Sequence, residues 1–204
     1  MHQLPLQIPS TLRITDEQFL HLVTANPDLR LERTAIGELI VMPPTGSEGG
    51  SYNAELTTDL VIWNRRTNLG KVFDSSTGFR LPNGATRSPD TAWIAQARWN
   101  SLTPDQRQRF APLCPDFVLE LISLTDAIED TQTKMREYID NGCRLGWLLN
   151  PKSRQVEIYR PNQIVEVIED PEFLFGEDIL PGFVLELRRN TITTLKLFKL
   201  KRLQ

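Results

Sequence analysis

The chain has 204 residues, 40% of them hydrophobic and 24% charged, so it is long and apolar enough to bury the core of one large domain. The formal net charge is −3, so the chain lacks the overall positive charge of proteins that bind nucleic acid regardless of sequence. A nucleic-acid-binding protein with only a local positively charged surface is not excluded. Two cysteines, Cys114 and Cys143, are too few for a disulfide framework or a zinc cluster.

The sequence carries no signal for export or for membrane insertion. The stretch "MHQLPLQIPS" lacks a basic region followed by an apolar core, and no later apolar run approaches the roughly 20 residues of a spanning helix. We therefore expect a cytoplasmic protein that is neither secreted nor membrane-spanning.

Two short strands and a long helix are predicted for the first third of the chain. The run "LRLERTAIGELIVMPP" indicates strands on either side of a turn at Gly37. After it, Leu56, Leu60 and Trp63 share one stripe at helical spacing, which predicts a helix over about 48–65.

Strand-like pieces follow at Val72, at 79–81 and at 91–95, separated by glycine and proline. We expect them to form an antiparallel meander. The segment "SLTPDQRQRFAP" then predicts a short surface helix closed by Pro112.

A strand, a helix and a second strand are predicted next. "DFVLELIS" is apolar on both faces, as in the middle of a covered sheet. "TDAIEDTQTKMREYIDNGC" offers Thr125 or Asp126 as the helix cap, a helical body through Ile139 and Gly142 as the stop signal. Because "RLGWLLNP" follows as a buried strand, we expect it to pair in parallel with the first strand.

The remaining chain indicates an extension of the same sheet. "QVEIYRP", "QIVEVIED" and "FVLELRR" are predicted as edge strands, and the basic segment 188–204 as a solvated tail. The fold class is therefore α/β, with a central mixed sheet flanked by helices, in one domain over 1–204.

Two carboxylates interrupt the predicted strands. From Phe117 to Ile122 in "PDFVLELIS", Glu120 is the only ionisable side chain of a strand expected to be buried, and a period of two places it on the face of Val118 and Ile122. An isolated buried carboxylate costs several kcal/mol, so Glu120 must be protonated, paired with a cation or bound to a metal. Asp90 opens its own strand in "SPDTAWIA". If the two strands are neighbours, both acids converge at one sheet end and can hold a hard divalent ion such as Mg²⁺.

A lysine on the following helix can join these acids. Lys134 and Tyr138 are four residues apart and share a helix face, from which Lys134 could reach Glu120. A lysine beside two metal-binding carboxylates suits phosphodiester hydrolysis. It can orient or deprotonate the attacking water, or neutralise the pentacovalent phosphate, while the metal acts as a Lewis acid.

Taken together, "SPD", "PDFVLELIS" and "KMREYIDNGCRLGWLLNP" resemble the Uma-type restriction endonuclease family, a branch of the PD-(D/E)XK nuclease superfamily. The resemblance covers about 29–151, including "GELIVMPPTG" and "VFDSSTGFRLPNGATRSPD". It implies a restriction-endonuclease-like core over 29–151, with 152–187 as a sheet extension. It also implies that Asp90 and Glu120 hold Mg²⁺ or Mn²⁺ and that the substrate is DNA.

The sequence departs from this pattern at two places. The wider superfamily carries its lysine two residues after the second acid, where this chain has Ile122; the resemblance therefore implies a migrated catalytic lysine, Lys134. The serine-proline-serine stretch that usually follows the second acid is replaced by residues 123–125. Glu48 lies where some of these nucleases carry an extra acid, but the preferred interpretation is a plain glutamate at the helix N-terminus, which the helix dipole favours.

Plainer interpretations stay open for the same residues. Glu120 and Lys134 could form only a buried ion pair, with Asp90 binding backbone N–H groups at the strand start. Tyr138, Trp93 and Trp147 are expected to be packing aromatics.

Two functions remain, a metal-dependent DNA endonuclease and a catalytically silent DNA-binding or protein-interaction module that keeps the fold. Because cutting both strands of a duplex is simplest with two copies of one site, and because the apolar edge pieces offer surface for a partner, we expect a homodimer.

Overall fold

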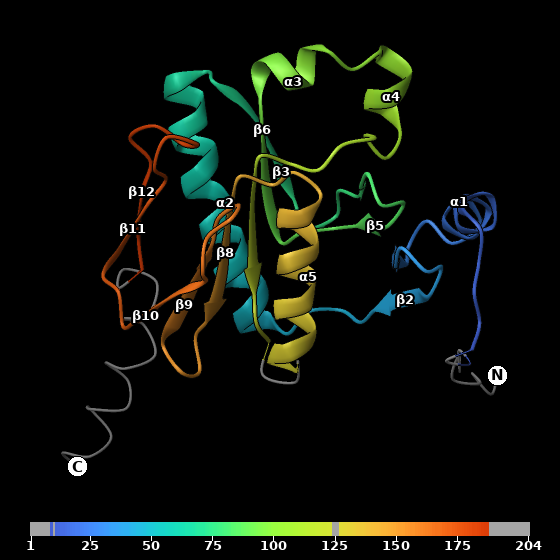
Figure 1. Cartoon of the computed structure of the whole chain (residues 1–204), viewed down its shortest axis with the longest axis horizontal. Coiled ribbons are helices and arrows are strands. Elements are labelled where there is room, and N and C mark those ends of the chain that lie inside the picture. Colours follow the sequence, from blue (N-terminus) through green and yellow to red (C-terminus); the bar gives the residue numbers. More distant parts are fainter. Residues whose placement is uncertain (1–8, 10, 124–126, 188–204) are drawn as a thin grey trace.

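A six-stranded mixed sheet forms the centre of the computed structural model, which describes residues 9, 11–123 and 127–187 (Figure 1). The strand order is β10-β9-β8-β7-β6-β3. Its strands are β3 (Gly70–Asp74), β6 (Thr91–Ala95), β7 (Phe117–Leu121), β8 (Leu145–Asn150), β9 (Gln155–Tyr159) and β10 (Glu166–Glu169). Strands β7 and β8 run parallel, as expected, and the other neighbours in this sheet run antiparallel.

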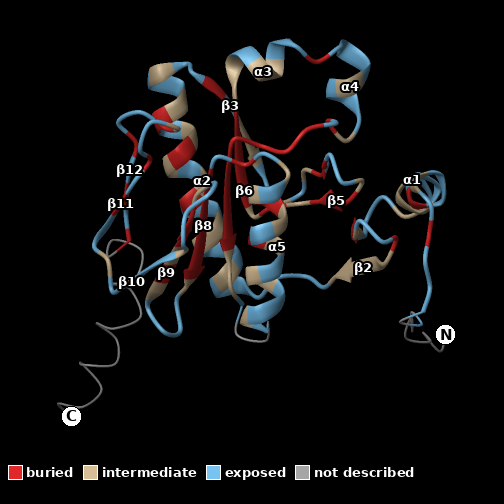
Figure 2. Ribbon diagram, viewed as in Figure 1, coloured by how far each residue is buried: buried red, intermediate tan, exposed pale blue. Residues whose placement is uncertain are grey.

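Two long helices cover opposite faces of the sheet. Helix α2 (Ser47–Thr67) packs its stripe of Leu56, Leu60 and Trp63 on the face that carries Phe117 and Leu119 of β7. Helix α5 (Ile128–Asp140) packs Met135 and Tyr138 on the other face, against Val118 and Leu148. Figure 2 shows the strands between them as buried. The predicted position of β7 between two covered faces is confirmed.

A smaller four-stranded sheet, in the order β2-β1-β5-β4, lies beside the main one. Its strands are β1 (Arg30–Arg33), β2 (Leu39–Met42), β4 (Phe79–Arg80) and β5 (Thr86–Arg87), and helix α1 (Asp16–Ala25) packs Phe19 against Leu31 of β1. The predicted turn between β1 and β2 holds Gly37 at φ +87°, where an added Cβ would lie 2.8 Å from the Ile14 carbonyl oxygen.

The predicted antiparallel meander is wrong. β3 pairs with β6 in the main sheet, whereas β4 and β5 pair with each other, and β5 joins β1 through Arg33 and Thr86. Phe79, Leu81 and Ala85 are buried in the core under α5, so this short hairpin folds toward the helix. Local strand patterns carry no information about such non-local pairing.

Short helices connect β6 to β7. Helix α3 (Gln96–Asn100) was not expected, whereas α4 (Pro104–Gln108) is the predicted surface helix and begins at a capping box made by Thr103 and Gln106. The predicted caps of α5, Thr125 and Asp126, lie outside the described residues together with Leu124. The cap residue of α5 is Ala127, which makes no side-chain cap hydrogen bond, so that prediction is wrong.

The C-terminal part extends the sheet only in part. β9 and β10 do so, but β12 (Val184–Glu186) pairs with β11 (Phe173–Phe175) in a separate two-stranded ribbon. The ribbon forms because Leu174 and Leu185 bury against the core on the α2 side. The predicted basic tail, 188–204, lies outside the described residues. Within the described ranges, no helix combines the length and apolarity needed to cross a membrane.

Candidate active site

Asp90 and Glu120 lie at the same end of two neighbouring central strands. β6 and β7 pair antiparallel with Thr91 opposite Leu119, which places Asp90, just before β6, beside Glu120. The backbone N–H of Leu121 donates to Oδ2 of Asp90 at 2.9 Å. Glu120 is 5% exposed, on the same face as Val118, as the period of two predicts. The two acids therefore converge as expected.

Lys134 reaches Glu120 from α5. Its Nζ lies 2.8 Å from Oε1 of Glu120 and 2.9 Å from Oε1 of Glu32, and it donates to the Ser88 carbonyl oxygen at 3.2 Å. The Tyr138 hydroxyl donates to the same Glu120 oxygen at 3.0 Å. Tyr138 is fully buried, so its ring packs in the core while its hydroxyl belongs to the site.

Glu32 on β1 is a site residue that the sequence did not reveal. It is 2% exposed, and Oε1 accepts hydrogen bonds from Lys134 and from the backbone N–H of Ser88, the latter at 2.9 Å. Oε2 accepts from Nη1 of Arg87 at 3.2 Å. Glu32 thus fixes both the lysine and the backbone that leads into Asp90. No sequence signal distinguishes it, because its partners lie 55 and 102 residues away along the chain.

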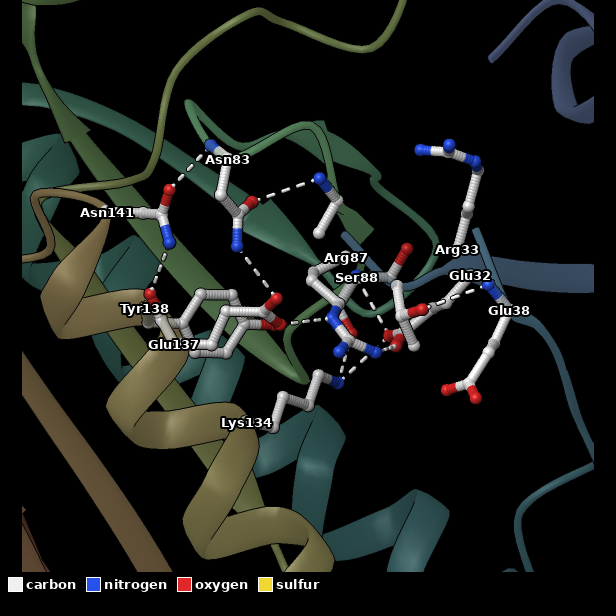
Figure 3. A network of polar contacts seen from close by, with 12 residues as sticks. Glu32, Arg33, Glu38, Asn83, Arg87, Ser88, Lys134, Glu137, Tyr138 and Asn141 are labelled. Carbon is white, nitrogen blue, oxygen red and sulfur yellow. Dashed lines mark hydrogen bonds and ion pairs between the residues drawn. The ribbon is translucent and has the colours of Figure 1, made fainter. Parts of the chain in front are cut away.

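A second layer of polar contacts ties the small sheet to α5 (Figure 3). Arg87 donates from Nε to Oε2 of Glu137 at 2.6 Å, and Nδ2 of Asn83 donates to the other Glu137 oxygen at 2.9 Å. The backbone N–H of Asn83 donates to Oδ1 of Asn141 at 2.8 Å. These contacts hold α5, and with it Lys134, against β5 and the turn before it.

Burial and neighbouring charges shift the pKa values of the ionisable site residues in different directions. Burial raises the pKa of Glu120 to about 7 against the lowering by Lys134, and the charges of Asp90 and Glu32 add to the rise. Burial likewise raises the pKa of Asp90. For Glu32, burial opposes ionisation, but Lys134 and Arg87 outweigh it and lower the pKa. Burial also opposes the charge on Lys134, yet Glu120 and Glu32 outweigh it and raise the pKa of the lysine, which stays cationic.

Comparisons with known proteins identify the family and the fold of the chain. The Uma2 family model, described as "Putative restriction endonuclease", matches residues 16–188. The chain belongs to the Uma2 family. Among solved structures it is similar to a "putative nuclease belonging to DUF820 from Anabaena variabilis ATCC 29413", at 19% identity and a TM-score of 0.73, over 87% of this chain and 97% of that one. That likeness shows a shared fold. No curated protein matches the chain.

The residues of this Uma2 chain fit a hard divalent cation that keeps most of its waters. Asp90 and Glu120 present carboxylate oxygens whose ionised forms are disfavoured by burial, and a cation relieves that cost. No group of three or more His, Cys, Asp or Glu among the described residues could enclose an ion. Carboxylate oxygens are the donors that Mg²⁺ and Mn²⁺ prefer, with water completing the coordination shell.

Helix α2 approaches the site through Asn53 and not through Glu48. Glu48 is exposed in the first turn of α2, where the helix dipole favours a carboxylate. Further along the helix, Nδ2 of Asn53 donates to Oδ1 of Asp90 at 3.4 Å. The structure thus favours the interpretation of Glu48 as a glutamate at the helix N-terminus, and it adds Asn53 to the site.

The contacts of the plainer interpretation are also present in this Uma2 protein. Glu120 pairs with Lys134, and Asp90 accepts a backbone N–H. Burial raises the pKa of both acids, whereas Lys134 and Arg87 outweigh burial and lower the pKa of Glu32.

Proposed function

We propose that this Uma2 protein has a restriction-endonuclease-like core and is an endonuclease that hydrolyses DNA phosphodiester bonds with Mg²⁺ or Mn²⁺. The observation that carries the proposal is the convergence of Asp90, Glu120 and Lys134 at one end of β6 and β7. Asp90 and Glu120 are the proposed metal ligands, and the bound ion supplies Lewis-acid activation and charge neutralisation.

Lys134 acts in this proposal as a cation and a hydrogen-bond donor. Its raised pKa disfavours the neutral amine that a general base needs. It is therefore assigned to orienting the attacking water or to stabilising the pentacovalent phosphate. Its three N–H groups have acceptors in Glu120, Glu32 and Ser88, and the Ser88 contact is the longest, at 3.2 Å. That contact is the one a substrate oxygen can replace while Glu32 keeps the lysine in place.

Because all three N–H groups of Lys134 already have protein acceptors, a second candidate is also supported. It is a catalytically silent DNA-binding or protein-interaction module. Ile122 stands where the superfamily resemblance expects the lysine, and Lys134 is fully partnered by protein groups. Such a module is expected to bind DNA or a protein without cutting it and without a specific need for Mg²⁺ or Mn²⁺.

Incubating the purified protein with supercoiled plasmid, single-stranded DNA and RNA tests the proposal. We expect plasmid nicking or cutting with Mg²⁺ or Mn²⁺, and none with Ca²⁺ or excess chelator, because Ca²⁺ is larger and takes more ligands in a looser geometry. Glu120→Gln, purified in parallel, controls for contaminating nucleases. Undiminished cleavage in chelator, or equal cleavage by Glu120→Gln, contradicts the proposal. DNA binding without cleavage in any metal favours the silent module.

We also propose that the protein acts as a homodimer. The outer face of the β11–β12 ribbon exposes Phe173, Phe175 and Val184, at 46%, 62% and 48%, and the edge strand β10 exposes Val167 at 55%. Exposed apolar side chains on the ribbon and on a sheet edge suit burial against a second copy. We expect sedimentation at micromolar concentration to show a dimer and Phe175→Asp to show a monomer. A parent protein that sediments only as a monomer contradicts this proposal.

A further inference from the structure

Asn53 has one unpaired polar atom next to the proposed metal ligands. Its Nδ2 makes only a long hydrogen bond of 3.4 Å to Oδ1 of Asp90. Its Oδ1 is buried and has no hydrogen-bond partner among residues 9, 11–123 and 127–187. A buried acceptor left unpaired is unfavourable, and such atoms are uncommon in folded proteins. This unpaired oxygen therefore belongs to a residue that directly contacts Asp90.

The surrounding structure holds Asn53 in that position. One turn further along α2, the hydroxyls of Thr57 and Thr91 share a hydrogen bond of 2.6 Å, which joins the helix to the residue after Asp90. One turn before Asn53 stand Gly49 and Gly50, and a Cβ built on Gly50 meets nothing within 4 Å. A Cβ built on Gly49 would lie 3.1 Å from Cγ2 of Thr45. The helix is thus joined to β6 on one side of Asn53 and is open at Gly50 on the other.

We propose that Asn53 is a third protein ligand, through Oδ1, of the cation held by Asp90 and Glu120. The proposal rests on the metal-dependent function above. An amide suits this position because its nitrogen can donate to Asp90 without metal, and rotation about the terminal torsion presents its oxygen to a cation instead. Amide oxygens are ordinary ligands of hard divalent ions. Nδ2 of Asn53, whose position Oδ1 takes after that rotation, lies 3.4 Å from Oδ1 of Asp90. Neighbouring ligands around an octahedral ion with bonds of about 2.1 Å are roughly 3 Å apart.

Mn²⁺ titration calorimetry and melting curves of three variants test the assignment. Asn53→Leu keeps the side-chain size and removes both polar atoms. We expect it to weaken Mn²⁺ binding at least about tenfold and to leave the melting temperature of the metal-free protein unchanged or higher, because the unpaired oxygen is gone. Asn53→Asp adds a third carboxylate. It should bind Mn²⁺ more tightly and lower the metal-free melting temperature by repulsion from Asp90.

Thr57→Val is the matched control. It loses the helix-to-strand hydrogen bond one turn away and should lower the melting temperature with little change in Mn²⁺ affinity. If Asn53→Leu binds Mn²⁺ as tightly as the parent, the assignment of Asn53 is overturned and the rest of the site is not. If the leucine variant fails to fold, an unchanged Mn²⁺ affinity in Asn53→Asp overturns the same assignment. A parent protein that takes up no Mn²⁺ overturns both this assignment and the proposed metal-dependent function.

Discussion

Lys134→Met is expected to reduce DNA cleavage by about two orders of magnitude or more, while the Mn²⁺ dissociation constant changes by less than about tenfold. The lysine is proposed to act on the attacking water or the phosphate, and the ion is assigned to Asp90 and Glu120. Plasmid-nicking rates and calorimetric Mn²⁺ titrations of the same preparations measure the two quantities separately.

The ion pairs of Lys134 determine which controls this experiment needs. Removing the cation leaves Glu120 with Tyr138 as a donor and Glu32 with Arg87 and the Ser88 N–H. Breaking a buried pair in this way typically costs roughly 3–5 kcal/mol. Lys134→Arg keeps the charge but not the compact ammonium, so it should fold and still cleave slowly. Lys152→Met makes the same change at an exposed position and should cleave as the parent does. A Lys134→Met protein with full activity would show that the lysine role belongs elsewhere.

Asp90→Asn is expected to leave the metal-free protein as stable as the parent, or more stable, and to abolish the stabilisation by Mn²⁺. Burial raises the pKa of Asp90, and its charge contributes to the raised pKa of Glu120, so the ionised pair is unfavourable without a cation. The asparagine can still accept the hydrogen bond from the Leu121 N–H. A ligand at 100 times its dissociation constant adds about 2.7 kcal/mol to the stability of the parent. This increment is visible as a rise in melting temperature.

A purely structural Asp90 predicts the reverse, a loss of roughly 0.5–2 kcal/mol with or without metal. Melting curves of parent and mutant, each in chelator and in excess Mn²⁺, decide between the two. Asp74→Asn is a matched control at the end of β3, where hydrogen bonds from Ser76 lower the pKa of the carboxyl. It should lose stability in chelator and keep the Mn²⁺ increment. The same behaviour in Asp90→Asn would refute Asp90 as a ligand.

The sequence predicts those parts of the site that depend on local pattern. Alternation along β7 identifies Glu120 as the ionisable residue of a buried strand, and helical spacing brings Lys134 to the right face of α5. Asp90 follows because β6 and β7 are neighbours. The chemistry of two acids beside a lysine suggests the roles of these residues, and the family resemblance implies the same roles.

The parts that sequence could not predict depend on non-local contacts. Glu32 looks like any polar residue of a short strand until the small sheet places it against Lys134 and Arg87. Asn53 looks like a surface residue of an amphipathic helix. In the same way β12 has the pattern of a sheet strand, but burial of Leu185 on the α2 side directs it to the ribbon with β11. In each case tertiary packing decides between placements that the local pattern allows equally.

Calorimetric titration of Mn²⁺ into the purified protein tests most directly whether Asp90 and Glu120 form a metal centre. The ligand form of Glu120 is the carboxylate, whose pKa is raised to about 7, so protons compete with the ion below that pH and binding should strengthen as the pH rises through it. We predict one ion per chain above that pH, weaker binding below it, and no specific binding by Asp90→Asn or Glu120→Gln. A parent protein that binds no Mn²⁺ above that pH, or that binds it as tightly after both substitutions, would contradict the account.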